Sequence, residues 1–143
     1  MRALGADVGE RRIGLAVSDP SGLIASPLAV LRRAEGDDAV GEIVARADEL
    51  GAKVIVVGMP VDLRGELGVA AQRIAEFVEA LRARSPVPVE TWDERLTSAA
   101  AARAMREAGL TERDQRGQVD KVAAALILQS WLDKRRAEAE RDA

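Results

Sequence analysis

The sequence predicts an α/β fold with one mixed β-sheet, in which three antiparallel strands are followed by parallel strands, and with helices on both faces of the sheet. Residues 2–31 contain three short apolar segments separated by turn residues, a pattern typical of antiparallel strands. From residue 37 onward, segments with helical spacing alternate with short apolar runs, which is typical of parallel strands joined by helices. The chain of 143 residues contains no internal repeat and no linker, so we expect residues 1–143 to form a single domain.

The N-terminal segment predicts a β-hairpin and a third strand. Between residues 2 and 19, two apolar runs flank the polar residues 9–12, as in a hairpin. A third strand is expected over residues 23–31, after the turn residues 20–22. Pro27 cannot donate a ladder hydrogen bond, so it favours a bulge or an edge position for this strand.

The next segment predicts a helix and a buried strand. Apolar residues follow helical spacing up to Leu50, Asp37 or Asp38 can cap this helix, and Gly51 can end it. Residues 53–58 are rich in valine and isoleucine without alternation, which is typical of a strand buried on both faces. We therefore expect this strand in the middle of the sheet.

The remaining elements complete an order that fits a ribonuclease H-like topology best. A charged tail, about residues 136–143, is expected to be flexible. The other expected elements are a helix over 69–81 that ends at Ser85 and Pro86, a strand over 87–92, a helix from Thr97 or Ser98 to Ala108, and a last helix that follows the polar stretch 111–118 and reaches toward Arg135.

The composition removes most enzyme mechanisms. The chain has no Cys and no His, which excludes disulfides, thiolate or histidine zinc sites and histidine-based nucleophilic triads. Carboxylates acting with hard metal ions are the leading chemistry that remains. The 24 acidic and 21 basic residues give a net charge of −3, which argues against a uniformly basic surface that coats nucleic acid.

No segment predicts a membrane span, because no run approaches the roughly 20 apolar residues that a span needs. Asp7 interrupts the N-terminal apolar stretch, where a signal peptide would be uncharged. We therefore expect a cytoplasmic protein without a membrane role.

Asp7 is the first candidate for chemistry. It shares one face of the predicted first strand with Ala3 and Gly5, so it lies on an apolar element. Burying an unpaired carboxylate costs on the order of several kcal/mol, so such a residue is protonated, paired with arginine or bound to a metal. The alternative is an aspartate that ends a strand and pairs with Arg11 or Arg12.

Asp93 and Glu94 form a second candidate, directly after the strand predicted over 87–92. Neighbouring strand residues point to opposite faces, so only one of the two carboxylates can face a given site. Ligands of α/β sheets gather beyond the carboxyl ends of strands, where this pair lies. The alternative is a solvated charged turn.

Asp120, near the start of the last helix, is the third candidate. It lies on the same helical stripe as Ala124, Ile127 and Trp131, and the alanines at 123–125 would let the helix approach the sheet closely. The alternative is a favourable interaction with the helix dipole. That interaction is worth only about 0.3 to 1 kcal/mol and does not explain the apolar face.

Three acids from separated segments can converge at one end of the sheet, where their mutual repulsion would require cations. Oxygen ligands without His or Cys suit Mg²⁺ or Mn²⁺. Two such ions roughly 4 Å apart can activate water and stabilise the leaving oxygen in phosphodiester cleavage. We therefore expect metal-assisted phosphodiester hydrolysis, with Asp7, Asp120 and either Glu94 or Asp93 as metal ligands.

The motifs around these acids resemble the YqgF family, also called RuvX, whose members are described as Holliday junction resolvases or as pre-16S rRNA nucleases. The resemblance spans nearly the whole chain. It implies a ribonuclease H-like fold with catalytic acids at Asp7, at Glu94 or Asp93, and at Asp120. The matching motifs are D-V-G at 7–9, R-I-G at 12–14, A-V-S-D at 16–19, G-M-P at 58–60, D-E-R-L-T at 93–97, and D-K at 120–121 followed by A-A at 123–124.

Two positions depart from the family pattern. Family members commonly carry Asn or Asp in the loop after G-x-P, whereas this chain has V-D-L-R-G at 61–65. Ser98 replaces a common threonine and keeps the hydroxyl. The altered loop bears on substrate contacts rather than on metal chemistry.

Basic residues fall in or beside the same loops, so we expect a basic rim around the site although the whole chain is acidic. Such a rim suits a phosphate backbone. Aromatic residues make up only 2%, which favours recognition of shape and phosphate over base stacking. The alternative is a set of solvated arginines in an arginine-rich chain. The basic residues concerned are Arg11, Arg12, Arg64, Arg95, Arg116 and Lys121.

The predicted function is a Mg²⁺-dependent endonuclease that acts on structured RNA, in maturation of the 5′ end of 16S rRNA from a precursor that is free or associated with the ribosome. Resolution of four-way DNA junctions is the close alternative; it needs two active sites and therefore a homodimer, whereas RNA trimming can use a monomer. A nucleotide-binding module is an alternative of another class, because the hairpin also resembles the phosphate loop of the actin and sugar-kinase superfamily. Those proteins clamp ATP between two such domains. A non-catalytic interaction module would tolerate replacement of Asp7.

Overall fold

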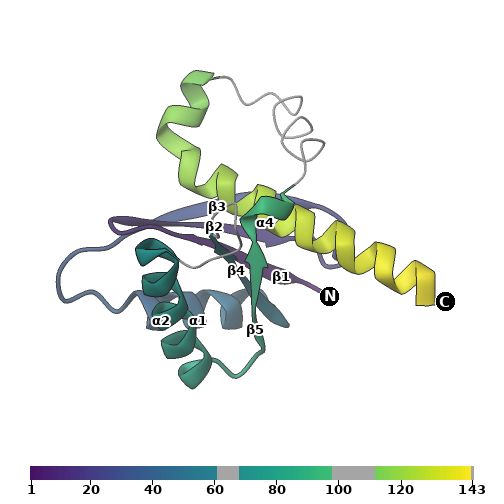
Figure 1. Cartoon of the computed structure of the whole chain (residues 1–143), viewed down its shortest axis with the longest axis horizontal. Helices are drawn as coiled ribbons and strands as arrows, with labels where there is room; N and C mark the ends of the chain where they lie inside the picture. Colours follow the sequence, from purple (N-terminus) through teal and green to yellow (C-terminus); the bar gives the residue numbers. More distant parts are fainter. Residues whose placement is uncertain (61–67, 98–111, 143) are drawn as a thin grey trace.

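The computed structural model of the chain describes residues 1–60, 68–97 and 112–142; for residues 112–119 it describes the backbone. Five strands form one sheet in the order β3-β2-β1-β4-β5 (Figure 1). Strands β1 and β2 pair antiparallel, as do β2 and β3, while β4 pairs parallel with both β1 and β5. The predicted mixed sheet is therefore confirmed. The strands are β1 (Ala3–Val8), β2 (Arg12–Ser18), β3 (Ala25–Arg32), β4 (Val54–Met59) and β5 (Val89–Asp93).

The positions of β4 and β3 in the sheet agree with their amino-acid composition. β4 lies between β1 and β5, and its residues 54–58 are fully buried, as its uninterrupted apolar run predicts. β3 is an edge strand, and its register with β2 shifts where Pro27 pairs with Ala16. Both findings confirm the prediction made from Pro27. A 3₁₀ turn, η1 (Glu94–Leu96), directly follows β5.

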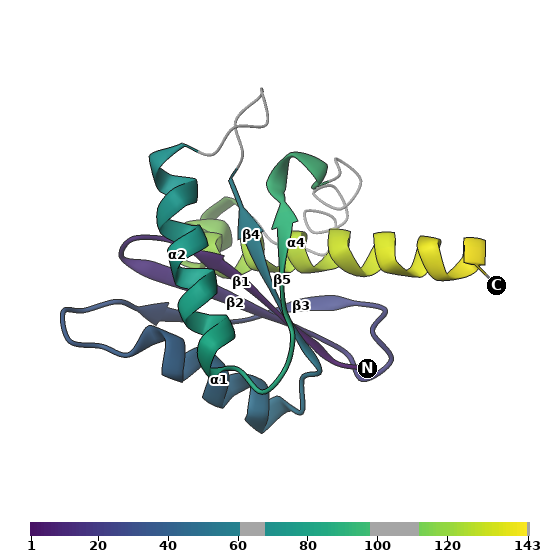
Figure 2. The ribbon, with the colours of Figure 1, turned by 60° about the horizontal axis from the view of Figure 1, so that its bottom comes forward.

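Helices α1 (Ala39–Leu50) and α2 (Val69–Arg84) cover one face of the sheet (Figures 1 and 2). The Asp38 carboxylate caps α1 by accepting a hydrogen bond of 3.0 Å from the Gly41 amide. Gly51 ends the helix in the left-handed region, at φ 66°, which is favourable for glycine. Helix α2 ends at Ser85, as predicted.

Helix α4 (Glu112–Asp142) crosses the opposite face of the sheet and packs on β1, β2 and β3. Figures 1 and 2 show that its C-terminal end extends beyond the sheet. Two expectations were wrong here. The polar stretch is helical from Glu112, and the helix continues to Asp142 instead of ending near Arg135. The segment after Arg135 is rich in Ala, Glu and Arg, which are strong helix formers, so charge alone does not end the helix. The helix predicted from Thr97 or Ser98 to Ala108 lies almost entirely outside the described residues.

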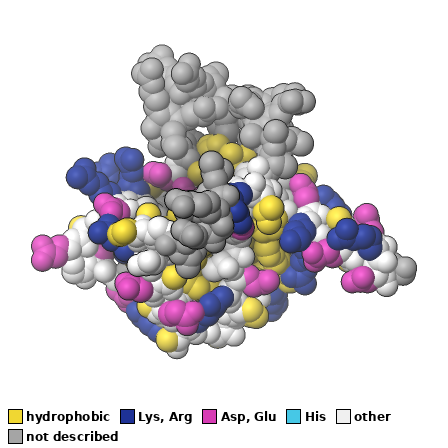
Figure 3. All heavy atoms as spheres, viewed as in Figure 1, with side chains coloured by type: hydrophobic (Ala, Val, Ile, Leu, Met, Phe, Trp, Pro, Cys, Tyr) yellow, Lys and Arg dark blue, Asp and Glu magenta, His cyan; other side chains and the backbone are white. Residues whose placement is uncertain are grey.

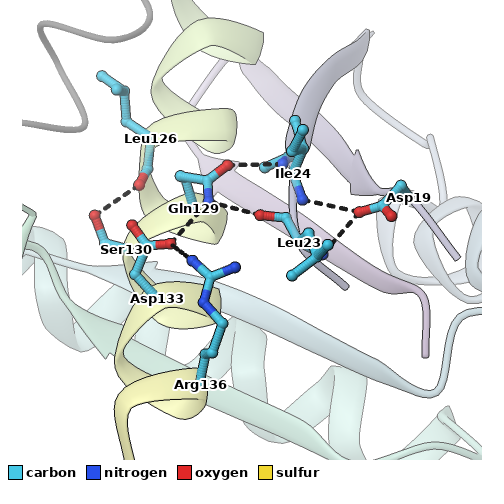
Figure 4. Close-up of polar contacts among 9 residues, drawn as sticks. Asp19, Leu23, Ile24, Leu126, Gln129, Ser130, Asp133 and Arg136 are labelled. Carbon is cyan, nitrogen blue, oxygen red and sulfur yellow. Dashed lines mark hydrogen bonds and ion pairs between the residues drawn. The ribbon is translucent and has the colours of Figure 1, made fainter. Parts of the chain in front are cut away.

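Gln129 fixes α4 against the turn between β2 and β3 (Figure 4). Its Oε1 atom accepts a hydrogen bond of 2.8 Å from the Ala25 amide, and its Nε2 atom donates one of 3.0 Å to the Leu23 carbonyl. Asp19 orders the same turn, because its Oδ1 atom accepts hydrogen bonds of 2.8 Å from the Leu23 and Ile24 amides. These contacts set the position of α4 along the sheet and thereby place its N-terminal part.

Within the described residues, no helix is long and apolar enough to cross a membrane.

Candidate active site

The structure brings Asp7 and Asp120 together through a glycine. Asp7 is paired across the sheet with Gly14 of β2. A Cβ atom added to Gly14 would lie 1.9 Å from the Asp120 carbonyl oxygen, so only glycine permits this approach of α4 to the sheet. Asp120 therefore lies over the strand next to Asp7. Sequence analysis quoted Gly14 only as part of a motif and missed this packing role.

Glu94 reaches the same place from η1, at the carboxyl end of β5. A Cβ atom on Gly58 of β4 would lie 3.3 Å from the Glu94 Oε1 atom, so the Glu94 carboxylate lies over the end of β4. Because Ala6 pairs with Val57, the end of β4 is adjacent to Asp7. Glu94 and Asp7 thus face one another across neighbouring strand ends.

Burial and neighbouring negative charge shift the pKa values of Asp7 and Glu94 in the same direction. Burial, and secondarily the charge of Asp120, raises the pKa of Asp7. Burial, followed by the charges of Asp7 and Asp93, raises the pKa of Glu94. Within the described residues, neither the Asp7 nor the Glu94 carboxylate has a hydrogen-bond or ion-pair partner. Both groups are consequently costly to keep ionised when no cation is present.

Asp93 occupies a different environment from Glu94. Its carboxylate caps η1 by accepting a hydrogen bond of 3.0 Å from the Arg95 amide, and it pairs with the Arg95 guanidinium, with 2.6 Å between Nη2 and Oδ2. The side-chain hydrogen bond with Arg95 lowers the pKa of Asp93. The Asp93 carboxylate is therefore bound within the turn η1 by Arg95, whereas the Glu94 carboxylate faces Asp7.

Of Asp7, Glu94 and Asp120, it is Asp120 that has a cationic partner among the described residues. The Arg12 Nε atom lies 3.0 Å from its Oδ2 atom, and the side chains are 64% and 29% exposed, respectively. The alternative in which Asp7 pairs with Arg11 or Arg12 is wrong, because Arg12 pairs with Asp120 of α4 and Asp7 forms no ion pair among the described residues. Asp120 does lie on the predicted helical stripe, since Ala124, Ile127 and Trp131 are all buried.

The donor chemistry of these acids fits a hard divalent cation, because every available atom is a carboxylate oxygen and two of the groups have no counter-ion among the described residues. In the described part of the chain, however, no three Asp or Glu side chains are close enough to hold one ion together. The Asp120 carboxylate is instead engaged by Arg12. The type and the location of these carboxylates thus fit a divalent cation, but the side chains do not form a complete coordination shell.

Of the predicted basic residues, Arg12 and Arg95 contact the acids, as described above. Lys121 follows Asp120 in α4, and Arg11 is exposed in the hairpin turn. Figure 3 shows basic and acidic side chains interspersed on the visible face. Arg64 lies outside the described residues, as does the side chain of Arg116.

A cleft of about 860 Å³ extends from Asp7 and Glu94 between the β1–β2 hairpin and α2. Its lining includes Arg33, whose guanidinium carbon lies 5.2 Å from the Phe77 ring centroid, and Arg73, which forms an ion pair with Glu10. Sequence analysis missed these residues. They come from three separate segments with no shared motif, so only the tertiary structure shows that they line one cleft.

A five-stranded mixed sheet with acids at the carboxyl ends of β1 and β5, faced by an acid on a crossing helix, defines the ribonuclease H-like class of α/β proteins. The solved structures agree. RuvC from T. thermophilus, in complex with Holliday junction substrate, is 22% identical, covers 95% of this chain and 96% of its own, and has a TM-score of 0.60. The fowlpox virus Holliday junction resolvase is 12% identical with a TM-score of 0.54, covering 94% and 99%.

The chain belongs to the RuvX family, described as Holliday junction resolvase, whose sequence model matches residues 1–134. A relative from Desulforudis audaxviator (strain MP104C) is 42% identical over 96% of this chain and 97% of its own. One from Mycobacterium tuberculosis (strain ATCC 25177 / H37Ra) is 45% identical over 95% of this chain and 81% of its own. Both relatives carry the name "Putative pre-16S rRNA nuclease". The resemblance to this family is therefore confirmed.

Proposed function

We propose that the protein is a metal-dependent endonuclease that hydrolyses phosphodiester bonds in structured RNA, in 5′-end maturation of 16S rRNA in the cytoplasm. The observation that carries this proposal is the convergence of Asp7, Glu94 and Asp120 from three separate elements. The names of the relatives that align along nearly the whole chain support the choice of substrate.

In this proposal Asp7, Glu94 and Asp120 hold Mg²⁺ or Mn²⁺. Such an ion, when bound, would lower the pKa of a water molecule and would supply positive charge to the phosphodiester reaction. The protein contributes two half-buried carboxylates, those of Asp7 and Glu94, whose ionisation is costly until a cation offsets it. Asp93 is assigned to the support of η1, because its carboxylate is held by Arg95.

Phosphate contacts are assigned to the basic residues around the acids. Arg12 is well exposed and its guanidinium lies beside the Asp120 carboxylate, where we expect the backbone of a nucleic acid to pass. Arg11, Arg95 and Lys121 come from the same end of the sheet, and Arg64 and Arg116 belong to this set from the sequence alone.

Cleavage of four-way DNA junctions is the second candidate, which the description of the family favours. A resolvase makes two symmetric cuts and needs two active sites, so this candidate also requires a homodimer. The RNA candidate is compatible with a monomer. The two therefore differ both in substrate and in oligomeric state.

The test is a parallel cleavage assay on a precursor of 16S rRNA and on a synthetic four-way junction, with Mg²⁺ and with EDTA. We expect Mg²⁺-dependent cleavage of the precursor. Glu94→Gln should lose at least about a hundredfold in rate, while the neighbouring Asp93→Asn, with the same change of charge, should stay within a few-fold of wild type. Cleavage of the junction alone would reject the RNA substrate, and equal loss in both variants would reject the assignment of Glu94.

A further inference from the structure

Arg12 combines two features that are unusual for a phosphate-binding arginine. It lies at the start of β2, and its side chain is 64% exposed, so it is accessible to a large ligand. Yet its Nε atom is already bound to the Asp120 Oδ2 atom at 3.0 Å. The Arg12 side chain is therefore both exposed to solvent and in contact with Asp120.

This ion pair places a cation on one of the three proposed metal ligands. A guanidinium and a metal ion compete for the same carboxylate lone pairs, and their like charges repel each other at short range. The backbone of Asp120 cannot yield, because its carbonyl packs on Gly14. Exchange between the two cations must therefore occur through rotation of the Arg12 and Asp120 side chains.

The exchange is energetically easy, because an ion pair this exposed contributes little to stability. A phosphate group offers the guanidinium a stronger, bidentate partner than a solvated carboxylate that it contacts through Nε. A phosphate of an approaching nucleic acid can thus bind the Arg12 guanidinium and leave the Asp120 carboxylate without its ion pair. This exchange does not apply to Asp7 and Glu94, because neither carboxylate forms an ion pair among the described residues.

We propose that Arg12 is a positioning residue that competes with the divalent cation for Asp120, and that a phosphate of the nucleic acid releases Asp120 by binding Arg12. Metal and nucleic acid then bind cooperatively, and the protein completes its metal site only when substrate is present. This inference rests on the proposed function, because it takes Asp120 as a metal ligand.

Calorimetric titration of Mg²⁺ into the full-length protein without nucleic acid tests the competition. Arg12→Gln should bind Mg²⁺ more tightly than wild type by about twofold to fivefold, the range that corresponds to the loss of an exposed ion pair. Arg12→Lys should remain close to wild type, since it keeps the charge. The matched control is Arg32→Gln. Arg32 is exposed, lies opposite Arg12 in the register of β2 and β3, and makes no ion pair among the described residues. The Mg²⁺ affinity of this variant should stay near that of wild type.

The coupling is tested by repeating the titration with a saturating phosphorothioate-substituted RNA hairpin. The RNA should increase the Mg²⁺ affinity of wild type by a larger factor than that of Arg12→Gln, because the variant has no guanidinium that can move from Asp120 to a phosphate. Unchanged or weaker Mg²⁺ binding by Arg12→Gln without RNA overturns the inference, as does an equal effect of RNA on both proteins.

The variant Asp7→Asn separates this inference from the proposed function. If Asp7→Asn loses Mg²⁺ binding while Arg12→Gln gains none, the metal site stands and the role of Arg12 fails. If Asp7→Asn binds Mg²⁺ as wild type does, the metal site itself is wrong and the inference is overturned with it.

Discussion

The two faces of the sheet are built from different kinds of residue. The face under α1 and α2 carries large aliphatic side chains at most of its buried strand positions. The face under α4 carries alanine and glycine at many strand positions, and it holds Asp7. The large residues on the first face include Leu4, Ile13, Leu15, Ile55 and Val57, and the small ones on the second include Ala3, Gly5, Gly14, Ala16 and Gly58.

This difference shows how the fold separates stability from chemistry. Large side chains bury more apolar area, so the α1 and α2 face contributes most per residue to the hydrophobic stabilisation. Small residues allow α4 to approach the strands closely enough for Asp120 to stand beside Asp7. The carboxylates therefore lie on the face of the sheet where the strands carry many small side chains.

The largest expected effect comes from Asp7→Asn, which removes one charge and one proposed ligand. Cleavage should fall by at least about a hundredfold. In EDTA the variant should melt at the same temperature as wild type or higher, because ionised Asp7 is destabilised by burial and by Asp120. Thermal melting beside a cleavage assay checks both results. A strongly destabilised variant that still cleaves would make Asp7 a structural residue and remove the contrast between the two faces.

Gly14→Ala tests whether close packing is what assembles the site. Its Cβ atom would collide with the Asp120 carbonyl, so α4 must shift away from the sheet. We expect the free energy of unfolding to fall by about 1 to 3 kcal/mol, with loss of cleavage. Gly68→Ala is the control, since a Cβ atom there meets no described residue within 4 Å. Equal effects of both substitutions in urea unfolding would contradict the packing argument.

The pH dependence of metal-free stability sharpens the comparison further. The pKa of Asp7 is raised above 3.8, so the folded protein binds this proton more tightly than the unfolded chain does. Stability is therefore lost as the pH rises from the unfolded value through the raised one. In EDTA, the melting temperature of Asp7→Asn relative to wild type should rise as the pH increases above about 4. A difference that stays constant with pH would mean that Asp7 is not crowded.

The smallest effect is expected on the opposite face, at Asp38. Its carboxylate caps α1 and pairs with Arg84, with 2.7 Å between Nη1 and Oδ1, and these bonds lower its pKa to about 2. The stability that it contributes is present above the unfolded value of 3.8 and is lost as the pH falls through about 2. Asp38→Ala should therefore melt slightly below wild type at neutral pH, with a smaller difference at pH of about 3 and unchanged cleavage. Altered cleavage would show that the two faces are coupled.

Much of the fold could be predicted from local sequence alone. The hairpin, the edge position that Pro27 favours, the Asp38 cap and the stop at Gly51 each depend on residues close in the chain, where backbone geometry and hydrogen-bonding groups act directly. The stripe on the last helix was also predictable, since helical periodicity relates Asp120 to Trp131. The extent of this helix was not, because charge alone does not mark a helix end.

The arrangement of the acids was decided by tertiary structure. Sequence identified Asp7, the Asp93 and Glu94 pair, and Asp120 as candidates, but the choice of partner among them depends on which strands and helices meet. Only the folded chain shows that Arg95 occupies Asp93, that Arg12 reaches Asp120 rather than Asp7, and that Glu94 is left facing Asp7. The physical reason is that ion pairs and burial act through space over a few ångströms, and the contacts with Arg12 and with Asp7 join residues far apart in the chain.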